Sequence, residues 1–192
     1  MEIHPPEGPV RSIKDFLVHL FMITLGILIA LGLEGAREAV HHRRQIAELR
    51  QGFRSEIAEN RAALVRWASA AGAVNGKVEA GALSDLRGQF VALKAVARDI
   101  ALSTGTLNLL EFDEVHRYAD AYTAQRAFEE QQGRLEAVWF ELTGAADAAN
   151  LSDADRRADI ARVRVAQAYL RSLKQLEQNA ITAYDEALRE PR

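Results

Sequence analysis

The feature that most constrains this chain is an uninterrupted apolar run near its amino terminus. Residues 16–33 contain no side chain with a formal charge at neutral pH, and Asp15 and Glu34 flank the run directly. As an α-helix, such a run would extend roughly 27 Å at about 1.5 Å per residue, close to the hydrocarbon thickness of a bilayer. The sequence therefore predicts one transmembrane helix over residues 16–33, preceded by a short tail over residues 1–15.

Two other interpretations of this run are open. A buried core helix of this length normally keeps a polar stripe, which the run lacks. A cleaved signal peptide is the closer rival, because Ala30-Leu-Gly32 satisfies the small-x-small pattern of cleavage sites. However, the apolar core of a signal peptide is usually only about 7 to 15 residues long, and here the helical pattern continues beyond the run. An uncleaved anchor is the favoured interpretation.

Polar and small residues add two hypotheses about the run. His19 lies one turn from Asp15, so a locally satisfied imidazole is a simpler interpretation than a proton relay. Small residues spaced by four allow two membrane helices to approach closely. Two such pairs occur in and just after the run: Gly26 with Ala30, and Gly32 with Ala36.

A basic cluster follows the run. Adjacent histidines on a helix point about 100° apart, so His41 and His42 cannot chelate one metal ion as an i, i+4 pair can. With Arg43 and Arg44 they are expected to contact lipid headgroups at the membrane interface. Arginines on both sides of the run leave the positive-inside rule only slightly in favour of a cytoplasmic carboxyl-terminal domain.

The rest of the chain predicts an all-α fold. No proline occurs between Val10 and Glu190, and the composition favours helix over strand. After the run, apolar residues recur every three or four positions, with Asn60 in the same stripe. The transmembrane helix is thus expected to continue into a long amphipathic helix that packs with about three further helices in an antiparallel bundle. The predicted helices of this domain, residues 34–192, cover about 34–80, 84–103, 113–143 and 152–189.

Several residues mark helix ends or polar core positions. Gly105 is expected to follow the end of the second helix, Asp113 to cap the third, and Ser152 with Asp155 to form a capping box on the fourth. Asn60 has two open interpretations: it specifies the register of a helical pair, or it is a satisfied polar group at the edge of the stripe.

No motif for catalysis or cofactor binding stands out. The chain has no cysteine, which excludes disulfides and thiolate metal sites, and its net charge of −3 gives no pull toward nucleic acid. His116, with Asp113 and Asp120 at helical spacing, is best interpreted as a solvated face rather than a metal site. Four aromatic residues are expected to pack in the core rather than line a pocket: Tyr118, Tyr122, Trp139 and Tyr169.

Several segments carry a resemblance. Met1–Val10, Gly26–Glu34, His41-His42-Arg43 and Ala101–Leu110, followed by helical Tyr118 and Tyr122, resemble an uncharacterised family of small bacterial inner-membrane proteins. The resemblance implies one amino-terminal anchor, a helical domain and a periplasmic location for that domain. It supplies no activity or site residue.

These features lead to one expectation and one alternative. The expected protein is a non-enzymatic, single-pass protein of the bacterial inner membrane that binds the lipid bilayer and a protein partner, or assembles as a homo-oligomer. It needs no cofactor and binds no nucleic acid. The alternative is a periplasmic sensor bundle that binds a small molecule between its helices and signals through a separate protein.

Overall fold

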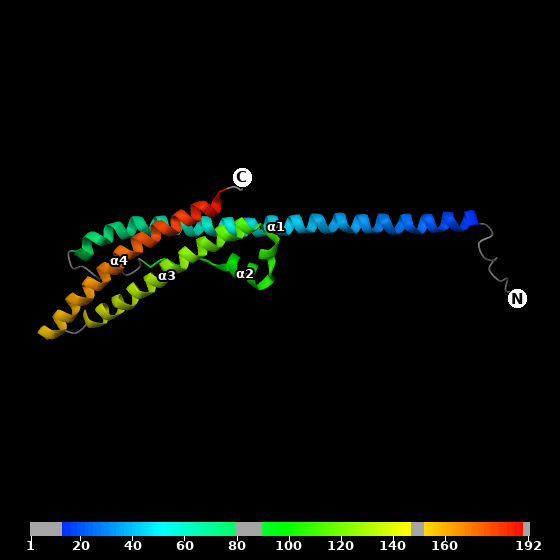
Figure 1. The fold of residues 1–192 in the computed structure, drawn as a ribbon. Coiled ribbons are helices and arrows are strands. Elements are labelled where there is room, and N and C mark those ends of the chain that lie inside the picture. The colour runs from blue at the N-terminus through cyan, green and yellow to red at the C-terminus, as the bar shows by residue number, and fades with distance from the viewer. Residues whose placement is uncertain (1–12, 80–89, 147–151, 190–192) are drawn as a thin grey trace, which may run out of the picture. The chain divides into compact units, whose positions relative to one another are not determined.

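The computed structural model describes residues 13–79, 90–146 and 152–189, and these residues are almost entirely helical. No strand occurs among them, which confirms the predicted all-α fold (Figure 1). The elements are α1 (Ile13–Glu79), α2 (Val96–Thr104), the short 3-10 helix η2 (Thr106–Leu109), α3 (Phe112–Ala146) and α4 (Asp153–Leu188).

The chain divides into two compact units, Met1–Ala47 and Glu48–Arg192. Helix α1 contributes its first part to unit 1 and its remainder, from Glu48, to unit 2.

In unit 1, the described residues form the apolar first part of α1. Every large apolar side chain between residues 16 and 33 is exposed, from 43% for Leu25 to 67% for Leu33. The polar groups of this segment are satisfied within the helix: His19 Nδ1 lies 2.8 Å from the Asp15 carbonyl oxygen, and the Thr24 hydroxyl donates to the Leu20 carbonyl at 2.7 Å. The local hydrogen bond expected for His19 is therefore present.

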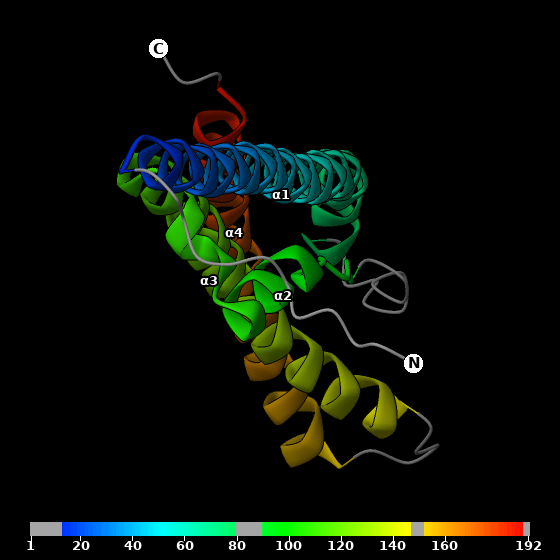
Figure 2. The ribbon, with the colours of Figure 1, turned by 90° about the vertical axis from the view of Figure 1, so that its right-hand side faces the viewer.

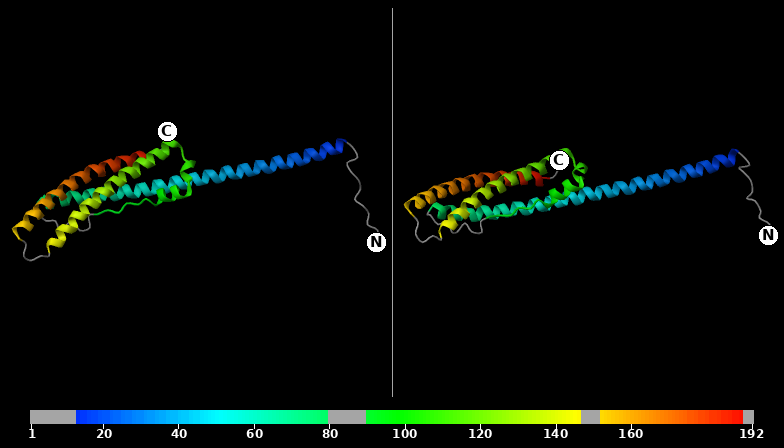
Figure 3. Two further views of the ribbon diagram at one scale, coloured as in Figure 1. Left: turned by 60° about the horizontal axis from the view of Figure 1, so that its bottom comes forward. Right: turned by 90° about the horizontal axis from the view of Figure 1, so that it is seen from below.

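In unit 2, α3 and α4 form an antiparallel hairpin, and they run side by side in every view (Figures 2 and 3). The second part of α1 contacts both helices through side chains: Trp67 meets Phe128 of α3 edge-to-face at 5.1 Å between ring centroids, and Arg61 pairs with Asp185 of α4 at 2.6 Å. The stripe predicted on α1 is confirmed over most of its described length, although its first members, Ile46 and Leu49, are only half-buried. The buried members are Phe53, Ile57, Asn60, Leu64, Trp67 and Ala71. Val74 and Val78 of the same stripe have side chains outside the described set.

The second helix is shorter than predicted. The sequence suggested helix over 84–103, but α2 begins only at Val96, and residues 90–95 are not helical. The physical reason is that side-chain amides from α1 and α3 take the backbone hydrogen bonds of this segment, as described below. Residues 84–89 of the predicted helix lie outside the described residues.

The helix ends follow local chemistry. Gly105 ends α2 with a φ of 67°, a left-handed conformation that glycine adopts without a Cβ penalty. Ser152 and Asp155 form the predicted capping box on α4. The Ser152 hydroxyl also donates to Asp155 Oδ2 at 2.6 Å, and this bond, followed by that from the Ser152 N–H, lowers the pKa of the Asp155 carboxyl. The predicted cap at Asp113 is wrong, because α3 already begins at Phe112 and places Asp113 in its first turn.

Candidate functional site

Unit 2 buries an unusual set of polar side chains among its aromatic residues. Burying such groups is costly unless they are hydrogen-bonded or paired, so their partners show what each does. The buried polar and charged residues are Glu56, Asn60, Glu114, Gln125, Gln131 and Glu177.

Glu56 joins α1 to α2 and α3. One carboxylate oxygen accepts the backbone N–H of Ala97 at 3.0 Å, and the other accepts the hydroxyl of Tyr122. The Arg98 guanidinium lies over the Tyr122 ring, 5.4 Å from its centroid. Burial, followed by the hydrogen bond to Glu56, raises the pKa of Tyr122 well above its usual value. The tyrosine therefore remains a neutral hydrogen-bond donor at physiological pH.

Glu114 of α3 is the centre of a second cluster. Arg50 Nε and Nη2 donate to its carboxylate at 2.8 Å each, in a forked arrangement, and the Tyr118 hydroxyl donates at 3.1 Å. Burial, with a smaller contribution from the Glu114 charge, raises the pKa of Tyr118 to about 12. The Tyr118 ring stacks on Phe53 at 4.5 Å between centroids.

A third network holds the non-helical segment 90–95. The Asn60 amide pairs with the backbone of Lys94: its Oδ1 accepts the N–H at 2.8 Å and its Nδ2 donates to the C=O at 2.7 Å. Gln132 of α3 pairs in the same way with the backbone of Val91, at 2.9 and 3.0 Å. Two side-chain amides thus replace the hydrogen bonds that a helix would have supplied.

Gln125 connects this network to α4. Its Oε1 accepts hydrogen bonds from Asn60 Nδ2 at 3.1 Å and from the Tyr184 hydroxyl at 2.9 Å. Asn60 is therefore a satisfied polar group, as one of its two interpretations held, but it lies in the core rather than at an edge, with 2% exposure. These three networks have no unpaired nucleophile facing a cavity, and their evident role is to join α1, α2, α3 and α4.

An apolar hollow of about 210 Å³ adjoins these networks. The aromatic rings of Phe53, Tyr118 and Tyr122 lie along it, and Arg98 and Arg126 supply two guanidinium groups. Its remaining lining comes from α2, η2 and α3: Leu102, Leu107, Val115, Ala119 and Thr123. An apolar hollow with a few polar groups is a common form of small-ligand site, although this one is smaller than most.

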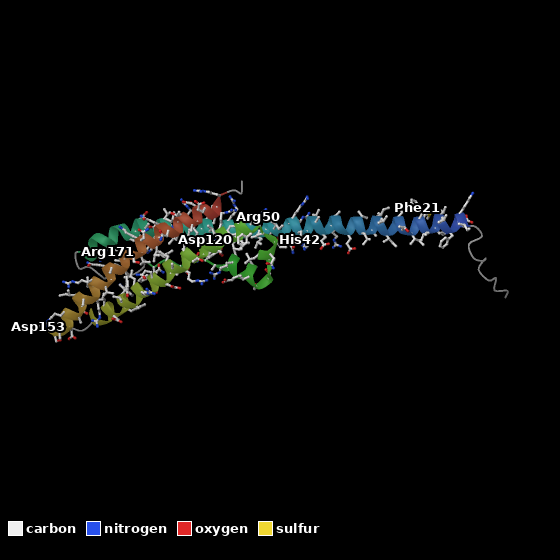
Figure 4. All side chains as sticks on the ribbon, in the orientation of Figure 1. Phe21, His42, Arg50, Asp120, Asp153 and Arg171 are labelled. Carbon is white, nitrogen blue, oxygen red and sulfur yellow. The ribbon has the colours of Figure 1, made fainter. Side chains whose placement is uncertain are left out.

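The residues predicted at the membrane all belong to unit 1. His41, His42, Arg43 and Arg44 are all exposed on α1. A Cβ added at Gly26 or Gly32 would meet no atom of the described chain within 4 Å, and Ala30 and Ala36 are exposed. Figure 4 labels Phe21 and His42 on this part of α1. Headgroup contact and helix association both stay predictions.

The remaining candidates separate into core and surface. Tyr118, Tyr122 and Trp139 are buried, as core packing predicted, although the first two also line the apolar hollow, while Tyr169 is half-buried. His116 Nδ1 lies 3.6 Å from Asp120 Oδ1 with both side chains 65% exposed. Within residues 13–79, 90–146 and 152–189, no group of three or more histidine, aspartate or glutamate side chains could hold a metal ion.

Comparison of the chain with protein-family models, with curated proteins and with solved structures found no significant match. Sequence reasoning missed the buried roles of Glu56, Glu114 and Gln125. Glu56 could have been suspected, because it lies three residues after Phe53 and four before Asn60, on the buried face of the helix.

Proposed function

We propose that this protein is a membrane-anchored helical protein that binds a protein partner, as an accessory subunit, and that residues 16–33 remain in the bilayer as its anchor. The observation that carries the proposal is the exposure of that uncharged segment. α1 contains the one stretch among the described residues that is long and apolar enough to cross a bilayer, and none of that stretch is buried.

This exposure argues against a core helix. Apolar surface left in water costs about 25 cal/mol per Å², and soluble proteins rarely leave large contiguous apolar patches uncovered. A core helix of the described chain would bury these side chains. A bilayer covers all sides of a helix at once, which suits a segment that has no polar stripe.

The partner-binding part of the proposal is supported by unit 2. Four of its buried polar side chains make hydrogen bonds between helices, namely Glu56, Asn60, Glu114 and Gln125. Apolar side chains, in contrast, remain exposed on α2 and at the start of α3. Val96 and Ile100, one turn apart on α2, are 60% and 55% exposed, and Phe112 is 81% exposed. We call Val96 and Ile100 the α2 face, and we propose that Phe112, at the start of α3, extends it. A face of this kind is typical of protein contact sites.

The proposal also covers which membrane holds the anchor and on which side of that membrane unit 2 lies. The resemblance described above favours the inner membrane of a bacterium with the helical domain in the periplasm. Because the chain has no cysteine, a single Asp153→Cys substitution would report the side directly. We expect a membrane-impermeant maleimide to label this exposed position in intact spheroplasts.

Anchoring is tested by fractionation and intact mass. The wild-type chain should stay in the membrane pellet after a carbonate wash, with a mass that includes residues 1–33. Leu25→Arg with Ile27→Arg should release it, because each charge at the centre of a span costs about 2.5–3.5 kcal/mol of insertion. The matched control is Leu25→Ala with Ile27→Ala. A soluble wild-type protein, or one beginning near Leu33, would contradict the anchor.

Partner binding is tested by photo-crosslinking in cells. A photoreactive residue at Ile100 or Phe112 should give one discrete adduct, and the same residue at Arg171, an exposed position on α4, should not. Equal crosslinking at all three positions, or none, would argue against the α2 face.

The apolar hollow favours a second candidate function, the small-molecule sensor. Its rings and the guanidinium group of Arg126 suit a small aromatic or aliphatic carboxylate, since Arg98 already pairs with Asp99 at 2.8 Å. A thermal-shift screen of such acids should then give one saturable shift, which Ala119→Phe abolishes by filling the hollow. Ala137→Phe, at an exposed position of the same helix, is the control.

A further inference from the structure

A second hollow in unit 2, of about 280 Å³, has an excess of positive charge. It lies where the second part of α1 meets the start of α3 and the end of α4. Figure 4 shows Arg50 and the start of α3 near this end of α4. Its lining residues are Arg50, Arg54, Glu114, Arg117, Tyr118, Ala187 and Arg189.

Two of its four arginines are already paired. Arg50 forms the forked ion pair with Glu114, which neutralises the one carboxylate of the lining. Arg189 donates from Nη1 to Glu186 at 2.9 Å. Both guanidinium charges are compensated, so the net positive charge of the lining comes from the other two arginines.

Arg54 and Arg117 carry that remaining charge. Arg54 makes no ion pair with any described residue. Arg117 Nε is buried and lacks a hydrogen-bond partner, the one such buried side-chain nitrogen or oxygen in the described part of the chain. Asp120 and Glu186 line a neighbouring hollow of about 290 Å³ that Arg117 also borders. Of those carboxylates, Glu186 pairs with Arg189 at 2.9 Å, and Asp120 Oδ1 lies 3.6 Å from His116 Nδ1.

An oxyanion in this hollow would supply the negative charge that Arg54 and Arg117 lack among the described residues. A buried N–H donor without an acceptor is costly, and charge-assisted hydrogen bonds from guanidinium to phosphate are among the strongest in proteins. Arginine presents several donors in a planar fork that matches phosphate oxygens. We propose that this hollow binds a phosphate-type oxyanion, either free phosphate or the phosphomonoester of a lipid headgroup, between Arg54 and Arg117. The site goes beyond the proposed function and does not depend on it.

The first arm of the test uses free phosphate. The full chain is purified in a neutral, phosphate-free detergent, and inorganic phosphate is added at constant ionic strength against chloride. The melting temperature should rise saturably in the wild type. Arg54→Gln and Arg117→Gln should each weaken the apparent affinity about tenfold or more, the loss expected for one charge-assisted hydrogen bond. Arg171→Gln, which removes an exposed arginine elsewhere on α4, should respond as wild type.

The second arm tests the lipid source. The same proteins are placed in vesicles of phosphatidylcholine with or without phosphatidic acid, whose headgroup is a phosphomonoester. A stabilisation by phosphatidic acid that needs Arg54 and Arg117, without any response to free phosphate, would assign the headgroup as the ligand. Should Arg117→Gln lose helicity without ligand, Arg54→Gln carries the comparison. The proposal is overturned if neither source gives a saturable shift in the wild type, or if Arg54→Gln responds as the wild type does.

Discussion

The carboxylate of Glu56 caps a helix to which it does not belong. It accepts the N–H of Ala97, the second residue of α2, at 3.0 Å. Ala95, at the N-cap position itself, has no side chain that could do so. The start of α2 is thus stabilised from α1, and the charge of Glu56 also suits the positive end of the α2 dipole.

We expect Glu56→Ala to lower the free energy of unfolding by about 2–3 kcal/mol, because it removes a buried cap and the acceptor of Tyr122. Glu56→Gln should cost less, since one amide oxygen remains as an acceptor. Urea denaturation followed by tryptophan fluorescence measures both variants. Glu59→Ala, which removes an exposed carboxylate one turn away, should be clearly milder; equal losses at the two positions would contradict the capping role.

Asn60→Ala should be similarly costly. The substitution leaves the Lys94 N–H without its acceptor in the core, and an unsatisfied buried group costs about 1–3 kcal/mol. Hydrogen exchange should show faster exchange of the Lys94 amide than in wild type. Asn179→Ala, an exposed asparagine on α4, should change stability by less than about 0.5 kcal/mol. An unchanged Lys94 exchange rate would show that the pairing is unimportant.

The buried Glu177 carboxyl is expected to give the stability of the fold a distinctive pH dependence. Burial raises the pKa of this carboxyl above its ordinary 4.5, so the folded state binds the proton more tightly than the unfolded state. Stability contributed by Glu177 is therefore lost as pH rises from the unfolded pKa through the folded one. Glu177→Gln should raise the melting temperature at pH 7 to 8 and match the wild type near pH 4. A constant difference across this range would contradict burial as the cause.

Gly26 offers a test of association within the membrane. A leucine there would hold a neighbouring helix away from the backbone, so Gly26→Leu should reduce self-association measured by energy transfer in vesicles. Leu28→Ala, on another face of the same helix, should leave it unchanged. Gly32→Leu tests the second small-residue pair separately. Self-association that survives both leucine variants would remove the role expected for these residues.

The helices were predictable where their periodicity was strong. The buried positions of α1 from Phe53 to Ala71 repeat every three or four residues, and the capping box at Ser152 depends only on neighbours in sequence. Such local signals do not need knowledge of the tertiary fold. The apolar run at 16–33 is equally local.

The structure of segment 90–95 could not be predicted, because it depends on contacts with residues distant in sequence. Its apolar spacing suits a helix, yet Asn60 and Gln132, each more than thirty residues away, take its backbone hydrogen bonds. The arginine-lined hollow likewise depends on Arg54, Arg117 and Arg189, which are separated in sequence and meet only through packing. No spacing rule applied to one sequence brings these residues together.

Because Asn60 and Gln132 pair with main-chain atoms, the two partners of each pair respond differently to substitution. These two amides form hydrogen bonds with the backbone N–H and C=O groups of residues 91 and 94, and these bonds do not involve the side chains at those positions. Substitution of Lys94 would remove its exposed ion pair with Glu59 but keep the N–H and C=O that Asn60 contacts, whereas substitution of Asn60 would remove the pairing itself. Proline alone is barred at 91 and 94, because it has no N–H to offer.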